Sequence, residues 1–137
     1  METTQNIKLA VDAVVFGYNK QEGISLLLIK RKYAPHKGLW ALPGGFVLNL
    51  ESLEQAVERE LEEETGVHIN YLEQLYTFGS PLRDPRERIV SVAYFGLVKA
   101  SEFEKLKAST DAEDAQWFNI KNLPKTCFDH PAIIQQA

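Results

Sequence analysis

Residues 45–67 constrain this chain more than any other part of its sequence. Glycine, glutamate and arginine recur there in a fixed order, which can be written G-x5-E-x7-R-E-L-x-E-E-x-G-V. At ordinary residue frequencies the seven glycine, glutamate and arginine positions coincide by chance with a probability on the order of one in a hundred million per starting point. The order is therefore a motif and not an accident of composition.

The second half of this segment predicts one α-helix over residues 53–65. Ser52 followed by Gln55 is a capping-box pattern, and Gly66 stands where a helix commonly ends in a left-handed residue. Apolar side chains recur at spacings of three and four and would form one buried stripe. They are Leu53, Ala56, Val57 and Leu61.

Three carboxylates on the predicted helix point to a cation site. Glu60, Glu63 and Glu64 stand at i, i+3 and i+4, where like charges repel one another. Hard cations such as Mg²⁺ prefer carboxylate and carbonyl oxygens and are often completed by substrate phosphates. An acidic helix face is more often simply solvated, and the glutamates alone would favour that interpretation.

The residues before the helix favour a cation site over a simply solvated helix face. Gly44 and Gly45 follow a Leu-Pro pair, and paired glycines let the main chain approach a metal or a phosphate. Glu51 and Arg59 carry opposite charges that could tie this loop to the helix. Together these residues predict a site for a divalent cation and a diphosphate.

With these residues in place, the segment resembles the Nudix box, and the chain is similar to the Nudix hydrolases. The match covers the full box and, more loosely, most of the chain. The resemblance implies a single α/β domain over residues 1–137, an α/β/α sandwich with a mixed β-sheet and a loop-helix-loop catalytic motif. It also implies hydrolysis of a diphosphate linkage into two monophosphates with Mg²⁺ or Mn²⁺ as the cofactor.

The resemblance also assigns roles to individual residues. The metal ligands would be Gly45, through its carbonyl, together with Glu60, Glu63 and Glu64. The catalytic set would be Glu63, Glu60, Arg59 and Glu51, with Arg59 orienting the glutamates and Glu51 bracing Arg59. The identity of the water-activating carboxylate stays open.

The loop between Gly45 and Glu51 departs from the family pattern. Many Nudix loops have a glutamate and a glycine in this interval, whereas this chain has Leu48 and Leu50. These leucines could pack against a partner subunit, because enzymes of the ADP-ribose branch are commonly homodimers. A homodimer is therefore the expected assembly.

Several further stretches resemble the branch of the family that acts on ADP-ribose. They are residues 71–79, 83–86, 91–94, 123–124 and 128–131. That branch splits ADP-ribose into AMP and ribose 5-phosphate. The candidate substrate-binding residues are Arg31, Gly44, Gly45, Arg83 and Arg86.

The candidate arginines have an ordinary alternative. A guanidinium could take phosphate oxygens in a forked pair or stack on adenine. Arg83 and Arg86 could equally pair with Asp84 and Glu87.

Aromatic, histidine and cysteine residues give weaker signals. Tyr18, Tyr76 and Phe78 could stack on a base, but strand aromatics are mostly core residues. Trp40 is expected to pack under the glycine loop. Ordinary roles are favoured for His36 and His68, and Cys127 is not expected to be a nucleophile.

Two other functions fit the same residues. The chain could be the ADP-ribose-sensing half of a transcriptional regulator of NAD metabolism, which predicts a basic DNA-binding module after residue 137. It could also remove oxidised nucleoside triphosphates, using the same cation site with a different base pocket. The complete set of box carboxylates favours hydrolysis over sensing.

Composition and charge limit the remaining classes of function and location. A formal charge of −4 argues against direct nucleic-acid binding by this chain, although Lys30, Arg31 and Lys32 form a local basic patch. No apolar run is long enough to span a membrane, and the N-terminus does not resemble a secretory signal. A single cysteine excludes an internal disulfide. These features favour a cytoplasmic protein.

The rest of the chain predicts a mostly β-structure around the helix. Strands are expected at residues 8–18 and 24–29, joined as a hairpin, and at 71–78, 89–98 and 114–120. A short final helix would be capped by Asp129, with Pro131 in its first turn.

Overall fold

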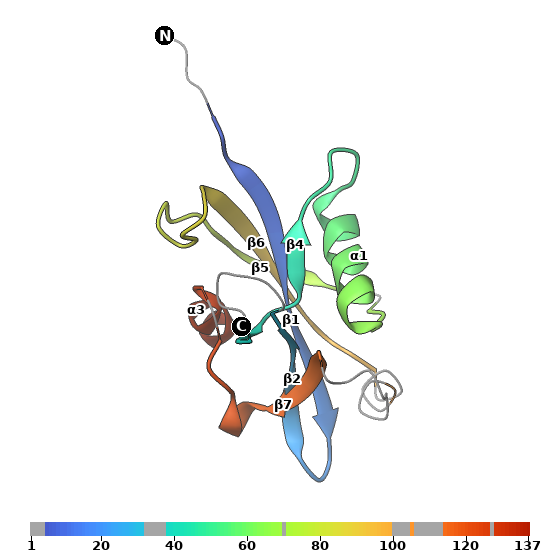
Figure 1. The fold of residues 1–137 in the computed structure, drawn as a ribbon. Coiled ribbons are helices and arrows are strands. Elements are labelled where there is room, and N and C mark those ends of the chain that lie inside the picture. Colours follow the sequence, from blue (N-terminus) through green and yellow to red (C-terminus); the bar gives the residue numbers. More distant parts are fainter. Residues whose placement is uncertain (1–4, 32–37, 70, 100–104, 106–113, 127) are drawn as a thin grey trace.

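The computed structural model describes residues 5–31, 38–69, 71–99, 105, 114–126 and 128–137 (Figure 1). The strands with described bounds are β1 (Lys8–Asn19), β2 (Gly23–Lys30), β3 (Trp40–Ala41), β4 (Gly44–Phe46), β5 (Glu73–Phe78), β6 (Ile89–Leu97) and β7 (Ala115–Asn119). The helices with described bounds are α1 (Leu53–Thr65), the 3₁₀ turn η1 (Ile120–Asn122) and α3 (His130–Gln136).

Seven strands form one mixed sheet within the described residues. The strand order is β3-β2-β1-β6-β5, while β4 pairs with β1 and β7 pairs with β2. β1 and β6 run parallel over nine paired positions, from Lys8 opposite Ile89 to Phe16 opposite Leu97, and the other pairs are antiparallel. β1 is therefore the central strand on which the sheet is assembled.

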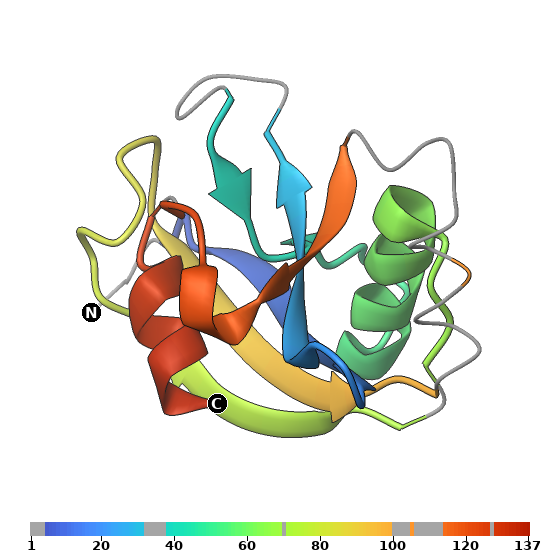
Figure 2. The ribbon, with the colours of Figure 1, turned by 90° about the horizontal axis from the view of Figure 1, so that it is seen from below.

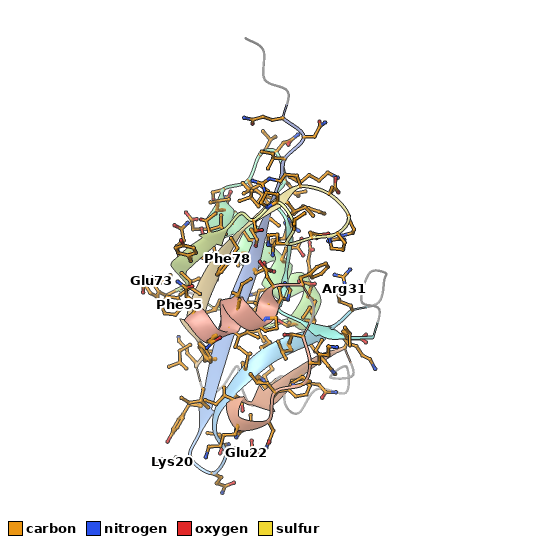
Figure 3. All side chains as sticks on the ribbon, turned by 90° about the vertical axis from the view of Figure 1, so that its left-hand side faces the viewer. Lys20, Glu22, Arg31, Glu73, Phe78 and Phe95 are labelled. Atoms are coloured by element: carbon orange, nitrogen blue, oxygen red, sulfur yellow. The ribbon has the colours of Figure 1, made fainter. Side chains whose placement is uncertain are left out.

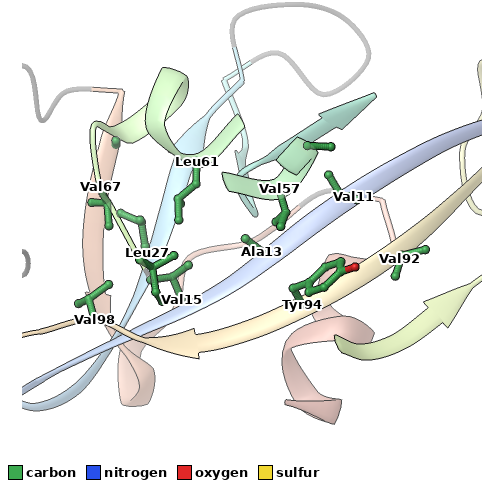
Figure 4. Close-up of a cluster of buried hydrophobic side chains, with 13 residues drawn as sticks. Val11, Ala13, Val15, Leu27, Val57, Leu61, Val67, Val92, Tyr94 and Val98 are labelled. Carbon is green, nitrogen blue, oxygen red and sulfur yellow. The ribbon is translucent and has the colours of Figure 1, made fainter. Parts of the chain in front are cut away.

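The two helices cover opposite faces of this sheet (Figure 2). On one face, Val57 and Leu61 of α1 pack against the inward side chains of β1, β2 and β6 (Figure 4). On the other face, Ile133 of α3 packs with Val14 of β1 and with neighbours from β2 and β6. Because successive side chains of a strand point to opposite faces, β1 is buried on both sides. The expected α/β/α sandwich is confirmed.

Helix α1 begins and ends as its sequence predicts. The Ser52 hydroxyl accepts a bond from the Gln55 N–H (3.1 Å), and the Gln55 side chain accepts one from the Ser52 N–H (2.8 Å). Gly66 is left-handed, with φ of 73°, and its N–H donates to the Glu62 carbonyl at 2.8 Å. The capping box and the glycine stop therefore set both ends of the helix that carries the carboxylates.

The strand predictions hold to within a few residues, but two short strands were not predicted. β3 and β4 have two and three residues, which is too short for an alternating pattern to be recognised. In β3, Trp40 packs edge-on against Phe118 at 4.8 Å and belongs to the same cluster as Leu42. The segment between β3 and β4 is thus held against the sheet at the point where the glycines begin.

The start of α3 differs from the prediction in one respect. Asp129 does precede the helix, but its side chain makes no capping bond to the helix backbone. Both carboxylate oxygens accept bonds from Arg83 instead. Because both oxygens accept bonds from one guanidinium, the Asp129 carboxylate holds Arg83 and does not cap the helix.

Candidate active site

Arg59 ties the carboxylates of α1 to the loop that precedes the helix. Its Nε and Nη2 donate to Glu51 at 2.9 and 2.7 Å, and its Nη1 donates to Glu60 at 2.7 Å and to Glu63 at 3.3 Å. Nη2 also reaches the Phe46 carbonyl at 3.1 Å. The hydrogen bonds that Glu51 accepts from Arg59 lower the pKa of Glu51, and the bonds that Arg59 donates to Glu51 and Glu60 raise the pKa of Arg59. The predicted link between loop and helix is thus present.

The two glycines are required by close approach and not by unusual backbone angles. Neither Gly44 nor Gly45 has a positive φ, which corrects the expectation of a special conformation. A Cβ added at Gly45 would lie 2.6 Å from the carboxyl carbon of Glu60, and one at Gly44 would collide with the Val11 carbonyl oxygen. The Gly44 N–H donates to Glu64 at 2.8 Å. The diglycine backbone therefore lies directly against the carboxylates.

The carboxylate cluster carries more negative charge than its arginine balances. Burial raises the pKa of Glu64 to about 8, with the neighbouring Glu60 and Asp12 adding to the effect. Burial also raises the pKa of Glu60, against the opposing effect of Arg59. Among the described residues no lysine or arginine is paired with Glu64. A cation would relieve this repulsion.

The donor atoms fit a hard divalent cation, although the ligands would have to rearrange to hold it. Carboxylate oxygens and the Gly45 backbone supply the oxygen chemistry that Mg²⁺ and Mn²⁺ prefer. Within the described ranges, no three His, Cys, Asp or Glu residues form a ready-made metal site, because Arg59 holds Glu60 and Glu63. Glu63 is 61% exposed and therefore has room to turn toward an ion.

A pocket of about 290 Å³ lies where the diglycine loop meets the loop before β6 and the start of α3. Gly44, Gly45 and Glu64 line one side of it. The other side is lined by polar and aromatic residues from four separate segments, namely Asp12, Arg31, Arg83, Asp84, Arg86, Phe128 and His130. The pocket thus gathers all the candidate substrate-binding residues and two of the four candidate metal ligands, Gly45 and Glu64. Glu51, Arg59, Glu60 and Glu63 are not among its lining residues.

Two of the candidate arginines, Arg83 and Arg86, are held by different carboxylates. Arg83 has a side chain only 5% exposed and makes a forked pair with Asp129 at 2.8 and 2.7 Å, with Asp12 at 3.9 Å. Although burial opposes its charge, the bonds to Asp129 leave the pKa of Arg83 raised. Arg86 pairs with Asp84 at 3.0 and 2.7 Å, as the alternative interpretation expected. For Arg83 the expected partners were wrong, because the carboxylate lies 46 residues away.

The aromatic ring of Phe128 lies close to two guanidinium groups at the pocket. The Arg31 Cζ lies 5.0 Å and the Arg86 Cζ 5.3 Å from the ring centroid. Phe128 has a φ of 54°, an uncommon value for a bulky residue and one that marks local strain. Figure 3 shows Arg31 near the start of α3, on the opposite side of that helix from Phe95.

Two further pocket residues, Asp12 and His130, were not predicted as site residues. The His130 Nδ1 accepts a bond from the Leu42 N–H at 3.1 Å, and its Nε2 lies 3.5 Å from Asp12 Oδ1. The Ser91 hydroxyl donates to Asp12 Oδ2. Burial lowers the pKa of His130. A lone aspartate inside the apolar run of β1 was the sequence signal that could have identified this group.

The remaining aromatic and histidine candidates do not reach the pocket. Tyr18 and Tyr76 are more than half exposed, Phe78 stacks edge-on with Tyr76 at 5.4 Å, and none of the three lines the pocket. His68 lies on the surface 3.6 Å from Glu62, as expected. His36 and Cys127 fall outside the described residues.

In the described part of the chain, no helix is both long and apolar enough to cross a membrane.

The chain is similar to known proteins over most of its length. The model of the NUDIX domain matches residues 7–136. The chain is 45% identical over 127 residues to an ADP-ribose pyrophosphatase of Methanocaldococcus jannaschii, covering 93% of this chain and 70% of that protein. It is 36% identical over 134 residues to the ADPR responsive transcriptional repressor NtrR of Acinetobacter baylyi, covering 94% of this chain but only 52% of the repressor.

A solved structure gives the same result at the level of the fold. The NUDIX domain of Shewanella oneidensis NrtR complexed with ADP ribose has a TM-score of 0.81 to this chain and 36% sequence identity, with 97% of this chain and 87% of that domain covered. With a matched family model and a relative well above 30% identity, the chain belongs to the NUDIX domain family.

Proposed function

We propose that this chain hydrolyses the diphosphate linkage of a nucleoside diphosphate derivative, with ADP-ribose as the substrate and AMP and ribose 5-phosphate as products. The observation that carries this proposal is the pocket in which Glu64 and the diglycine loop face a group of arginines. One side suits a cation and the other suits a phosphate or a base. The 45% identity to an archaeal ADP-ribose pyrophosphatase supports the same substrate.

The metal site would be formed by Glu60, Glu63, Glu64 and the carbonyl of Gly45. A divalent cation held there, Mg²⁺ or Mn²⁺, would neutralise charge on the diphosphate and activate water. The protein's own part is to hold these oxygens close together. Arg59 aligns Glu60 and Glu63, Glu51 holds Arg59, and the Gly44 N–H orients Glu64.

The substrate would be held by the opposite side of the pocket. Arg31 and Arg86, the second of which already pairs with Asp84, lie where their guanidinium groups can donate hydrogen bonds to phosphate oxygens, and the adjacent Phe128 ring offers a surface for a base. Arg83 contributes less directly, because its side chain is only 5% exposed and its guanidinium already donates two hydrogen bonds to Asp129. Its proposed role is to hold that wall of the pocket in place.

A substrate panel tests the reaction. The purified chain is incubated with Mg²⁺ and ADP-ribose, NADH, a diadenosine polyphosphate, GDP-mannose or dGTP, and release of AMP or phosphate is measured. Preferred cleavage of ADP-ribose is expected. Preferred cleavage of dGTP would favour removal of damaged nucleotides, and absence of any cleavage would contradict the hydrolase proposal.

The second candidate function is sensing of ADP-ribose by a regulator. It is favoured by the 36% identity to an ADPR responsive repressor, of which this chain spans about half. Isothermal titration with ADP-ribose separates the two functions. Tight binding without cleavage in Mg²⁺ would support a sensor, whereas cleavage supports the enzyme.

We also propose that the protein is a homodimer in the cytoplasm. Leu50 is fully exposed and Leu48 is 56% exposed, so both are available to a second subunit. Light scattering after size exclusion should give a dimer mass, and Leu48→Ser with Leu50→Ser should shift it toward the monomer. An unchanged mass in the double variant would exclude these leucines from the interface.

A further inference from the structure

The pocket wall formed by α3 contains a buried polar cluster that hydrolysis does not by itself require. Its members are Asp12, Arg83, Ser91, Asp129 and His130. The five residues come from four segments, since only Asp129 and His130 are adjacent in the sequence, and Ser91 is completely buried. Burying so many polar groups is unfavourable unless each is satisfied, so the cluster requires an explanation.

His130 makes the bond that links this cluster to the metal side of the pocket. Its Nδ1 accepts the Leu42 N–H at 3.1 Å, across 88 residues of sequence. A nitrogen that accepts a hydrogen bond carries no proton, so the neutral ring has its hydrogen on Nε2. That nitrogen faces Asp12 Oδ1 at 3.5 Å, and the Arg83–Asp129 pair adjoins the same carboxylate.

Leu42 begins the loop that ends at the proposed metal ligand Gly45. The Pro43 carbonyl accepts the Ala13 N–H at 2.8 Å, and the Gly44 N–H donates to Glu64 at 2.8 Å. Gly44 also pairs with Asp12 across the β1 and β4 strands. Each residue from Leu42 to Gly44 is therefore fixed by one bond, and His130 supplies the first of them.

We propose that His130 is a positioning residue that fixes the Leu42 end of the diglycine loop and thereby sets Glu64 and the Gly45 carbonyl for the cation. This inference rests on the proposed function, which makes those two groups metal ligands. Asp12 orients the His130 ring, and the Arg83–Asp129 pair anchors the start of α3. The histidine does not touch the reacting atoms. Loss of a residue that orients metal ligands typically lowers metal affinity or activity about 10- to 100-fold.

Three substitutions of His130 separate positioning from simple packing. In His130→Asn the side-chain oxygen can replace Nδ1 and accept the Leu42 N–H. In His130→Gln the amide extends toward Asp12, and its acceptor is displaced from the Nδ1 position. His130→Ala removes both contacts. His68→Asn is the matched control, because that histidine is exposed and lies away from the pocket.

Three measurements are made on each variant: hydrogen exchange of the Leu42 amide, Mn²⁺ affinity by electron paramagnetic resonance, and kcat and KM for ADP-ribose. For His130→Ala and His130→Gln we expect about tenfold faster exchange, about tenfold weaker Mn²⁺ binding and about tenfold lower kcat, with KM little changed. His130→Asn should recover most of each loss. The control should match the wild type.

Equal behaviour of the Asn and Gln variants, or Mn²⁺ affinity at the wild-type level in a folded His130→Ala, would overturn the inference. Circular dichroism confirms folding, and the comparison of Asn with Gln decides the matter if the Ala variant does not fold. Absence of ADP-ribose cleavage by the wild type would contradict only the proposed function. The exchange and Mn²⁺ measurements would still test His130.

Discussion

The acidic and basic sides of the proposed site are built in opposite ways. The acidic side comes from one continuous segment, in which Glu51, Arg59, Glu60 and Glu63 lie within 13 residues and are joined by a single arginine. The basic side is assembled from β1, the end of β2, the loop before β6 and the start of α3. Its forked ion pair joins Arg83 to Asp129 across 46 residues.

This difference determines how each side responds to change. The acidic side is set by helix geometry, so its residues keep their spacing whenever α1 forms. The basic side exists only after the sheet and α3 have come together. Substitutions on the acidic side should therefore impair chemistry with little effect on folding, and those on the basic side should affect stability as well.

The largest expected effect is on the acidic side. Glu64→Gln or Glu63→Gln removes one metal-facing charge and should lower kcat for ADP-ribose by roughly 10²- to 10⁴-fold. Glu64→Gln should not destabilise the metal-free protein, since burial already disfavours the charged carboxylate. Steady-state kinetics and urea unfolding measure the two effects. Wild-type turnover in both variants would refute the metal-site assignment.

Gly45→Ala tests the close approach of loop and helix. The new Cβ would lie 2.6 Å from the Glu60 carboxyl carbon, so either the carboxylate or the loop must move. We expect kcat to fall by about 10²-fold, in line with an Ångström-scale misplacement of a catalytic group. Gly79→Ala is the control, because its Cβ would meet only Val90 at 3.9 Å. Equal activity of both variants would show that the contact is not needed.

The acidic side was predictable because its information is local. The helix ends, the apolar stripe and the carboxylate partners of Arg59 all follow from spacings of eight residues or fewer. Glu51 could be assigned to Arg59 for the same reason. The reaction, hydrolysis of a diphosphate linkage, could not be predicted from these spacings and came from the resemblance to the Nudix family.

The basic side was predictable only in part. Arg31, Arg83 and Arg86 were identified as candidates, but the partner of Arg83 depends on how α3 docks, which no local pattern encodes. Asp129 had the sequence position of a cap and serves instead as a counter-ion. Asp12 was hidden inside an apolar strand, and the role of Phe128 depends on a backbone angle that its sequence does not indicate.

Arg83→Ala should therefore reduce stability more than a typical surface change. It leaves Asp129 without its forked partner in a mostly buried setting, which typically costs about 3 kcal/mol of unfolding free energy. Lys8→Ala is the control, since it breaks the exposed pair with Glu87 near the same loop and should cost less than about 1 kcal/mol. Urea unfolding measures both. Similar losses would mean that the Arg83 pair contributes no more than a surface pair.

The smallest expected effect is the pH dependence of stability that His130 adds on the basic side. Burial lowers the pKa of His130 in the folded chain, against the opposing influence of Asp12 and Asp129, so the unfolded chain binds its proton more readily. As pH falls below about 6.5, the unfolded state gains that proton first and stability is lost until the folded-state pKa is reached. The slope from one such group is at most about 1.4 kcal/mol per pH unit.

His130→Asn cannot titrate, so its unfolding free energy should fall less than that of the wild type between pH 7.5 and 5. His68→Asn should follow the wild type, because that histidine is exposed. Parallel curves for the wild type and His130→Asn would mean that the ring is not held neutral, and the link between α3 and the diglycine loop would then lose its acceptor.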